Sequence, residues 1–207
     1  NDEQRSFPYL CEYHLLTHLF YIYWTTDPMN YKELIKNNDV YAVVVTFNGE
    51  TTISDCLKSL ENSDFPVKII VVDNNSTDKT KEIVSRFPDV NFLTQNKNLG
   101  FGQANNIGIK YALEKNADFV FLLNQDAEIK SDTIEYLLEI AIRDPQYGII
   151  SPIHLNGSGE KFDPGFFFFV KKYGSKFTSD LYFQAITDFY DLPVINAAAW
   201  MISKDCI

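Results

Sequence analysis

The chain has 207 residues, 45% of them hydrophobic and 22% charged, with a formal net charge of −10 at pH 7. This composition excludes a disordered chain and fits one globular domain with a substantial core and room for an appendage. The acidic balance argues against nucleic acid as a partner, because phosphate backbones bind clustered cations, and it suits a site that holds a divalent cation.

Cysteine usage and hydropathy restrict the expected compartment. Cys11, Cys56 and Cys206 are odd in number and have no metal-binding spacing, which indicates a reducing compartment without a disulfide framework. No apolar run reaches the roughly 18 residues that span a bilayer, and the first residues lack the pattern of a signal peptide. We therefore expect a cytoplasmic protein.

Residues 1–38 form an aromatic-rich N-terminal extension that differs from the rest of the chain. Within Leu10–Trp24, apolar residues recur at helical spacing, which predicts a helix packed on the domain or on a second chain in a homo-oligomer. A peripheral contact with the inner face of the cell membrane is the alternative, although the stretch lacks the Lys and Arg face of an interfacial helix. Met29 is a candidate native start, in which case residues 1–28 are foreign to the fold.

From Val40 onwards, apolar runs typical of buried strands alternate with amphipathic helical patterns. The predicted strands are Tyr41–Thr46, Val67–Val72, Val90–Thr94, Asp118–Leu123 and Gly148–Ser151. Short links between strand and helix imply right-handed βαβ units and a mostly parallel sheet flanked by helices. We therefore expect an α/β core over residues 39–151.

Helices are predicted in the links between the first four strands and after the fourth, from apolar positions at helical spacing. Ser76 or Thr77 is the expected N-cap of the second helix, with Asp78 placed favourably in its first turn. Ser131 is the expected N-cap of the helix that follows the fourth strand, and Asp144-Pro145 is expected to end that helix.

The alternation is lost in residues 152–207, which form a separate and less regular region. Asn156–Gly159 has the composition of a turn. Phe166–Val170 is expected to be an edge strand or part of a binding groove, and Val194–Ser203 is apolar and rich in alanine. Three carboxylates of this region are in the right area for a catalytic role but are expected at the surface or in turns, namely Asp163, Asp188 and Asp191.

Three of the predicted strands end in polar residues. Asn124-Gln125-Asp126 follows the apolar run Phe119–Leu123, while Thr46–Asn48 and Asp73–Asn75 end the first two strands. The carboxyl edge of a parallel sheet is where open α/β folds bind ligands, so these side chains indicate a site for a nucleotide and its metal. The structural alternative is that each cluster only caps the helix that follows it.

Each cluster has a chemistry that suits a nucleotide. Backbone N–H groups at the helix start after Thr46 suit a nucleobase or a phosphate. A carboxylate at Asp73 can accept the N3–H of uracil or thymine, whereas adenine has no matching donor. Asp126 can bind Mg²⁺ or Mn²⁺, which prefer oxygen ligands and retain several waters, and such an ion would neutralise a departing diphosphate.

The glycine-containing loop Asn98–Gly108 leads into a predicted helix. It lacks the third glycine of a dinucleotide fingerprint and does not follow the first strand, so it is not interpreted as one. Gly100 lets the loop approach a ligand closely, whereas Gly108 indicates tight helix packing.

Four segments carry a family resemblance when they are taken in order: Val45–Asn48, Val71–Asp78, Asn98–Ile109 and Leu123–Ala127. They resemble the motifs of family 2 glycosyltransferases, most of all those of the rhamnosyltransferase-like branch. The resemblance is clear over residues 39–151 and loose over residues 152–207. It implies a GT-A fold, a UDP- or dTDP-sugar donor, and inverting transfer of one sugar to a saccharide or lipid-linked acceptor in polysaccharide biosynthesis.

By this resemblance the donor is held by motif residues, namely Thr46, Asn48, Glu50, Asp73, Asn75, Gly100, Asn106, Asn124 and Gln125. Asp73 would read the base, and Asp126 would be the metal aspartate with Mg²⁺ or Mn²⁺ as the cofactor. Asn124 stands where the family often has the first Asp of its D-x-D motif. This departure removes one negative charge but retains the usual direct metal ligand.

Asn196–Lys204 resembles the segment before the family's acceptor-side Glu-Asp motif, whose acid deprotonates the acceptor hydroxyl. No such motif precedes Ile207, so no catalytic base is assigned, and we expect a truncated chain or a base from elsewhere. Residues 152–207 would be a partial acceptor-side region. Two alternative functions remain to be compared with this interpretation. A sugar-1-phosphate nucleotidyltransferase would need Arg and Lys after the first strand, which Phe47–Glu50 lacks. A catalytically silent nucleotide-binding or interaction module would need no catalytic base.

Overall fold

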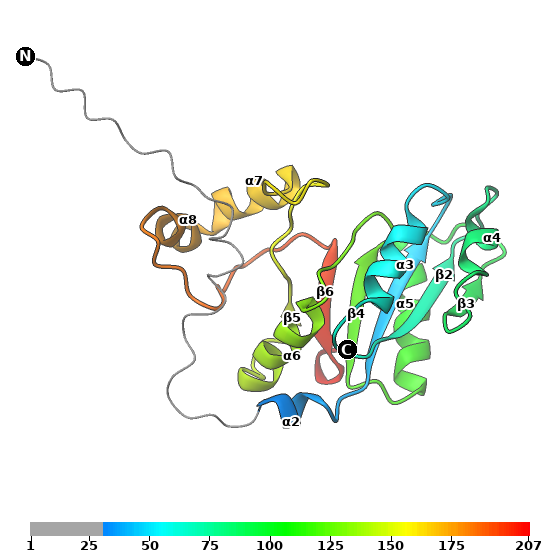
Figure 1. The fold of residues 1–207 in the computed structure, drawn as a ribbon, viewed down its shortest axis with the longest axis horizontal. Helices are drawn as coiled ribbons and strands as arrows, with labels where there is room; N and C mark the ends of the chain where they lie inside the picture. Colours follow the sequence, from blue (N-terminus) through cyan, green and yellow to red (C-terminus); the bar gives the residue numbers. More distant parts are fainter. Residues whose placement is uncertain (1–30) are drawn as a thin grey trace, which may run out of the picture.

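The computed structural model describes residues 31–207, and Figure 1 shows their arrangement as a sheet with helices on both faces. The helix predicted within Leu10–Trp24, the candidate start Met29 and Cys11 lie outside the described residues. The strands are β1 Val40–Thr46, β2 Lys68–Asp73, β3 Asn91–Thr94, β4 Phe119–Asn124, β5 Ile149–Ile150 and β6 Ala199–Ser203. The helices are α2 Tyr31–Ile35, α3 Ile53–Glu61, α4 Thr80–Val84, α5 Phe101–Glu114, α6 Thr133–Arg143, α7 Pro164–Tyr173, α8 Ser175–Tyr182 and the 3₁₀ turn η1 Lys204–Cys206.

The strand order of the sheet is β3-β2-β1-β4-β6-β5. Strands β1 to β4 are parallel, whereas β6 runs antiparallel to both β4 and β5. The chain builds outward from β1 through β2 to β3 and then crosses to β4 on the other side of β1. The prediction of a mostly parallel α/β sheet is therefore confirmed, and its topological switch point lies between β1 and β4.

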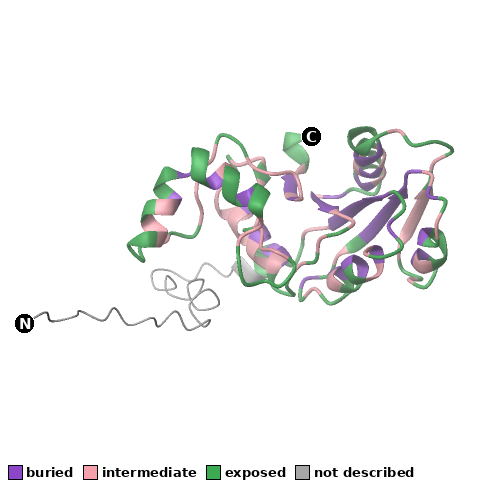
Figure 2. Cartoon of the chain, turned by 90° about the horizontal axis from the view of Figure 1, so that it is seen from above, coloured by how far each residue is buried: buried purple, intermediate pink, exposed green. Residues whose placement is uncertain are grey.

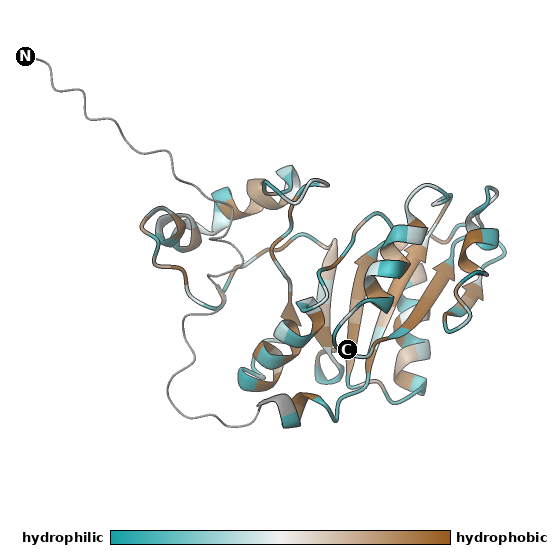
Figure 3. Ribbon diagram, in the orientation of Figure 1, coloured by the Kyte–Doolittle hydropathy of each residue, from teal (hydrophilic) through white to brown (hydrophobic). Residues whose placement is uncertain are grey.

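The core consists of two layers, one on each face of the sheet. Helices α3, α4 and α6 contribute buried residues to one layer, and α5 contributes to the other. All seven residues of β1 are buried, because alternate side chains enter opposite layers. The strands accordingly form the apolar centre of Figure 3.

Gly108 of α5 packs directly on β1. A Cβ at this position would lie 2.3 Å from Val43 Cγ1, so a larger residue cannot occupy it without a shift. This confirms the interpretation of Gly108 as a helix-packing glycine.

The prediction of an edge strand at Phe166–Val170 is wrong, because these residues belong to helix α7. Asp163 Oδ1 accepts a hydrogen bond from the Phe166 N–H at 2.9 Å, and Pro164 is the first residue of the helix. An Asp cap followed by Pro is a typical helix start, and it outweighs the strand preference of a Phe run. Phe166 and Val170, one turn apart, enter a small core shared with Phe177 of α8.

Two predicted helix caps are also wrong. Helix α4 follows Lys79 at its N-cap position, so neither Ser76 nor Thr77 caps it, and both instead bond to the loop after β1. Helix α6 has Asp132 at its N-cap position, whereas the Ser131 hydroxyl donates to Asp64 at 2.8 Å. In both places the hydroxyl finds a partner on a different element. Among residues 31–207, no helix is long and apolar enough to cross a bilayer.

Candidate functional site

A pocket of about 370 Å³ opens at the carboxyl edge of the sheet, beside the switch point between β1 and β4. Open α/β sheets bind their ligands at such a place. Its lining residues come from the ends of β1, β2 and β4 and from the start of α5: Val45, Phe47, Asn74, Asn98, Gly100, Phe101, Asn124, Gln125 and Asp126. The predicted site residues Gly100, Asn124, Gln125 and Asp126 are thus brought together in one pocket.

Gln125 joins the two strand ends that border the pocket. Its Oε1 accepts hydrogen bonds from the Thr46 hydroxyl at 2.6 Å and from the Phe47 N–H at 3.0 Å, and its Nε2 donates to the Phe47 carbonyl at 3.3 Å. Thr46 is fully buried, so its hydroxyl has its bond within the protein. A Cβ at Gly49 would lie 2.4 Å from Gln125 Oε1, which leaves room only for glycine. Thr46 and Gln125 therefore shape the pocket by binding each other.

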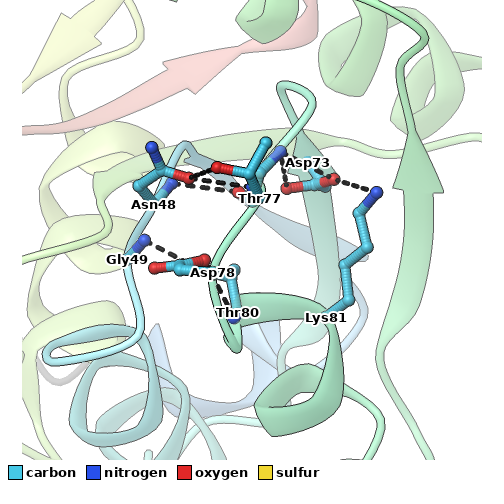
Figure 4. Close-up of polar contacts among 8 residues, drawn as sticks. Asn48, Gly49, Asp73, Thr77, Asp78, Thr80 and Lys81 are labelled. Carbon is cyan, nitrogen blue, oxygen red and sulfur yellow. Dashed lines mark hydrogen bonds and ion pairs between the residues drawn. The ribbon is translucent and has the colours of Figure 1, made fainter.

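The loops after β1 and β2 are held together by a reciprocal set of hydrogen bonds, and Figure 4 draws those that involve Asn48, Gly49 and Thr80. Asn48 Oδ1 accepts from the Thr77 N–H at 2.9 Å, and Glu50 Oε2 accepts from the Lys79 N–H at 3.0 Å. In return, the Gly49 N–H donates to the Thr80 hydroxyl at 2.8 Å. Asn48 and Glu50, which were predicted to line the nucleotide, thus stabilise the wall of the site through loop contacts.

Asp78 completes this set of loop contacts. It accepts from the Glu50 N–H and from the Thr80 N–H, both at 3.0 Å. Partial loss of solvent raises the pKa of Asp78, but the hydrogen bonds from Thr80 and Glu50 outweigh it, and the pKa lies below its ordinary value. Asp78 therefore has the structural role predicted for it, although it precedes α4 rather than lying in its first turn.

Asp73 lies at the end of β2 with its carboxylate fully buried. Both oxygens accept from the Ser76 N–H, at 3.1 and 3.3 Å, and Lys81 Nζ lies 3.5 Å from Oδ2 (Figure 4). The register places Asp73 beside Thr46 of β1. The loop that begins at Asn74 therefore covers this carboxylate in the described state.

The start of α5 is fixed to the end of β2 by two asparagines that the sequence analysis did not single out. Asn74 is buried, donates to Asn98 Oδ1 and accepts from the Leu99 N–H, both at 2.8 Å. Gly100 then adopts φ 81° and ψ 162°, a conformation open essentially to glycine alone, as it enters the helix. Both asparagines lie inside the motif segments that carry the family resemblance, close to the predicted site residues Asp73 and Gly100.

Besides Thr46, Asn48, Glu50 and Asp73, two further predicted donor residues lie outside the pocket lining. Asn75 has φ 71° and is half-buried in the loop after β2. Asn106 is exposed on α5 and borders a separate shallow groove with Leu113 and Ile207. Phe47 and Phe101, which were not predicted as site residues, do line the pocket and are 43% and 49% exposed. Both rings are therefore accessible to a ligand in this pocket.

Asn124 and Asp126 both line this pocket and both carry side-chain oxygen atoms. The Asn124 Oδ1 atom is buried and has no hydrogen-bond partner among the described residues. Asp126 is exposed, and within residues 31–207 its carboxylate forms no hydrogen bond or ion pair. No group of three potential metal ligands occurs in that part of the chain. Two free oxygens on one turn nevertheless fit Mg²⁺ or Mn²⁺, which need few protein ligands when a diphosphate and water supply the rest.

Cys56 of α3 lies behind this turn, and its Sγ is 3.5 Å from the Asn124 carbonyl oxygen. Burial raises the pKa of its thiol to about 12, with further contributions from the negative charges of Asp126 and Glu128. The thiol is therefore neutral and unreactive at physiological pH. The protein behind the pocket turn is therefore closely packed around Cys56, and Asp126 adds negative potential there.

The sequence profile described as Glycosyl transferase family 2 matches residues 41–205. The chain belongs to this family. The dTDP-rhamnosyl transferase RfbF of Shigella flexneri is 33% identical over 101 residues, which cover 49% of this chain and 34% of the relative. The N-acetylglucosaminyl-diphospho-decaprenol L-rhamnosyltransferase of Mycobacterium tuberculosis is 33% identical over 126 residues, covering 56% and 41%. The predicted rhamnosyltransferase-like branch is thus confirmed, and the chain spans about a third to two fifths of the length of these relatives.

A solved glycosyltransferase structure has the same fold as this family 2 glycosyltransferase chain. The mannosyltransferase PcManGT from Pyrobaculum calidifontis, in complex with GDP-Man and Mn²⁺, matches with a TM-score of 0.60 over 86% of this chain and 52% of that chain. Its sequence identity is 20%, so the likeness concerns the fold alone. The predicted GT-A fold is confirmed.

Proposed function

We propose that the chain is the donor-binding part of an inverting glycosyltransferase that takes a sugar from a UDP- or dTDP-sugar. The observation that carries this proposal lies at the switch point of the sheet, where neither the Asp126 carboxylate nor the buried Asn124 Oδ1 has a partner among residues 31–207. The similarity to a dTDP-rhamnosyl transferase supports the pyrimidine nucleotide.

Asp126 is proposed to hold Mg²⁺ or Mn²⁺, with the buried Asn124 Oδ1 as a second oxygen ligand. The bound ion would supply Lewis-acid stabilisation of the diphosphate leaving group. The Mn²⁺ complex of the mannosyltransferase with the same fold supports a divalent cation. Gln125, between these two residues, holds the turn against β1, so that both oxygens keep their positions without a large cluster of charges.

The base is proposed to stack on Phe47 or Phe101, whose exposed rings line the pocket. Stacking of one base on an aromatic side chain contributes about 1–3 kcal/mol and does not select among bases. Selection is assigned to Asp73, which accepts N3–H of uracil or thymine. Because Asp73 is fully buried, donor binding must displace the loop from Asn74 to Thr77 that covers it.

Thr46, Asn48 and Glu50 are proposed to act on the donor by holding the pocket wall in place, since their side chains bind neighbouring loops. Asn75, Gly100 and Asn106 remain proposed donor contacts. The acceptor is proposed to be a saccharide or a lipid-linked saccharide, as the decaprenol-linked substrate in one relative's name suggests. The setting would be polysaccharide biosynthesis in the cytoplasm, at the inner face of the membrane, with a homo-oligomer as a further proposal.

Calorimetric titration with dTDP and UDP, each with and without Mn²⁺, tests the donor site. Asp126→Ala should abolish the manganese-dependent part of the affinity, because its carboxylate is the proposed direct ligand. Glu128→Ala is the matched control, since it removes an exposed carboxylate from the same turn outside the pocket lining. Equal affinity in Asp126→Ala and Glu128→Ala would refute the metal assignment.

A catalytically silent nucleotide-binding module is the alternative, and one observation favours it. Within residues 31–207, Asp126 is the only carboxylate that lines the pocket, which leaves no second acid there to deprotonate an acceptor. We therefore propose that the base comes from outside this pocket lining. A donor-hydrolysis assay separates the two functions, because a silent module would bind the nucleotide without turnover.

A further inference from the structure

Exposed aromatic side chains gather in two places on the described part of the chain. Two of them, Phe47 and Phe101, line the donor pocket. The others all lie between Phe167 and Phe183, on α7, on α8 and just after α8. Figure 2 shows these helices as a small lobe beside the sheet with largely exposed outer faces.

The outer surface of this lobe combines aromatic rings with lysines. We define it by Phe167, Phe168, Lys171, Lys172, Tyr182 and Phe183. Phe168, Tyr182 and Phe183 are 59%, 81% and 72% exposed. The small core of the lobe is formed by Phe166, Val170 and Phe177, which lie on the other faces of the two helices. The exposed rings are therefore not part of this core.

The charge of this segment is opposite to that of the chain. Residues 161–183 contain four lysines and two aspartates, a formal charge of +2, whereas the whole chain carries −10. Asp180 neutralises Lys176 at 2.6 Å, but no ion pair holds Lys171 or Lys172 within residues 31–207. Lys172 lies 5.9 and 4.9 Å from the ring centres of Phe168 and Tyr173, so its cation stays beside the rings.

We propose that the outer surface of the α7–α8 lobe binds an anionic lipid bilayer. Aromatic rings insert at the level of the lipid headgroups, and lysines extend their charges to the lipid phosphates while their stems cover apolar surface. Although the whole chain is acidic, this surface presents aromatic rings together with lysines that form no ion pair within residues 31–207. It therefore matches a partner surface that is negatively charged and partly apolar. An acidic, sparsely apolar partner would not use the rings, and an apolar protein partner would not use the lysines.

The lobe is connected to the donor pocket through the segment before β6. Asn196 Nδ2 lies near the start of α7, 3.4 Å from where a Cβ on Gly165 would be. Two residues later, the Ala198 carbonyl accepts from the Asn124 N–H at 3.0 Å. A lobe bound to the bilayer would therefore hold the pocket close to the membrane surface. That consequence for a lipid-linked acceptor rests on the proposed function, whereas the binding to lipid does not.

Vesicle co-sedimentation tests the proposal on the full chain, with vesicles of phosphatidylcholine alone and with about 30% phosphatidylglycerol. The chain should bind the anionic vesicles more tightly, and salt should weaken the binding. Lys171→Gln with Lys172→Gln should weaken partition about 30-fold, from the usual contribution of each lysine near an anionic surface. Phe168→Ser with Phe183→Ser should weaken binding to both kinds of vesicle.

The matched control is Lys58→Gln with Lys110→Gln, which removes the same charge from α3 and α5. It should change partition by less than about twofold, because charges distant from the contact are screened. Unchanged thermal unfolding shows that each variant is folded, and dTDP titration reports the donor site separately. Absence of vesicle binding, equal binding without phosphatidylglycerol, or equal effects of the two lysine pairs would overturn the proposal. The proposal would also be overturned if the unmodified chain were a dimer that does not bind vesicles, and if Phe168→Ser with Phe183→Ser dissociated that dimer.

Discussion

The hydrogen bonds of Gln125 make a quantitative prediction about stability. In Gln125→Leu the Thr46 hydroxyl loses its acceptor at 2.6 Å while it remains fully buried. An unsatisfied buried hydroxyl costs about 1–3 kcal/mol, whereas the exposed Phe47 N–H can turn to water. We therefore expect Gln125→Leu to lower the free energy of unfolding by about 2 kcal/mol, and the midpoint of thermal unfolding by about 4–8 °C.

The double-mutant cycle with Thr46→Val isolates this interaction. Thr46→Val alone should cost about 1 kcal/mol, because Gln125 Oε1 still accepts from the Phe47 N–H. In the double variant no buried hydroxyl is left without a partner, so the combined loss should fall about 1 kcal/mol short of the sum. Gln125→Glu retains both acceptor contacts and should be less destabilised than Gln125→Leu at neutral pH. Urea unfolding followed by circular dichroism measures the wild type and all four variants. Additive losses in the cycle would refute the assignment of Gln125 to the buried hydroxyl.

Three further changes test other parts of the structure by the same urea titration. Gly108→Ala should destabilise the fold by about 1–3 kcal/mol, because the added Cβ would meet Val43. This is the opposite of the usual effect, since Gly→Ala in an open helix is normally stabilising. Adding Val43→Ala to the same chain should recover part of the loss. The raised pKa of Cys56, about 12, stabilises the fold below the unfolded-state pKa near 9, and this contribution is lost as the pH rises toward 12. Between about pH 9 and pH 10 the protein should thus lose about 1 kcal/mol more than Cys56→Ala, and parallel pH curves would contradict a buried thiol. Asp163→Ala should remove the N-cap of α7 at a cost of about 1 kcal/mol, whereas Asp163→Asn should be nearly neutral because it can still accept the cap bond. Equal losses in the two variants would show that this hydrogen bond contributes little to stability.

The sheet and the edge that carries the site were predictable from local sequence patterns. Parallel strands covered on both faces appear as continuous apolar runs, as in Val40–Thr46 and Phe119–Asn124. Once the strands are parallel, their polar ends must meet at one edge, and the switch point lies where the connections reverse. The pocket at Asn124 to Asp126 follows from these two rules, and its position was predicted for that reason.

The partners of the individual side chains were not predictable in the same way. Thr46 bonds to Gln125, 79 positions later, and this contact depends on the register that pairs Val45 with Asn124. Asn48 was weighed as a helix cap, but its oxygen binds the loop after β2, because the two loops lie side by side. In α7, the Phe run has strand propensity, while the cap formed by Asp163 and the packing of Phe166 determine a helix.

The neutral side chain at Asn124 is consistent with the burial of its Oδ1 atom. The Asn124 N–H is held by Ala198, and its carbonyl faces the Cys56 thiol, whose pKa is raised by burial and by Asp126. A second carboxylate with a buried oxygen would add desolvation and repulsion from Asp126 before any cation arrives. A diphosphate brings negative charges of its own, so one carboxylate and one amide oxygen can be enough to hold the ion once the donor binds. At the proposed metal site, the departure from the family's acidic pair would thus make metal binding depend more strongly on the nucleotide, rather than remove it.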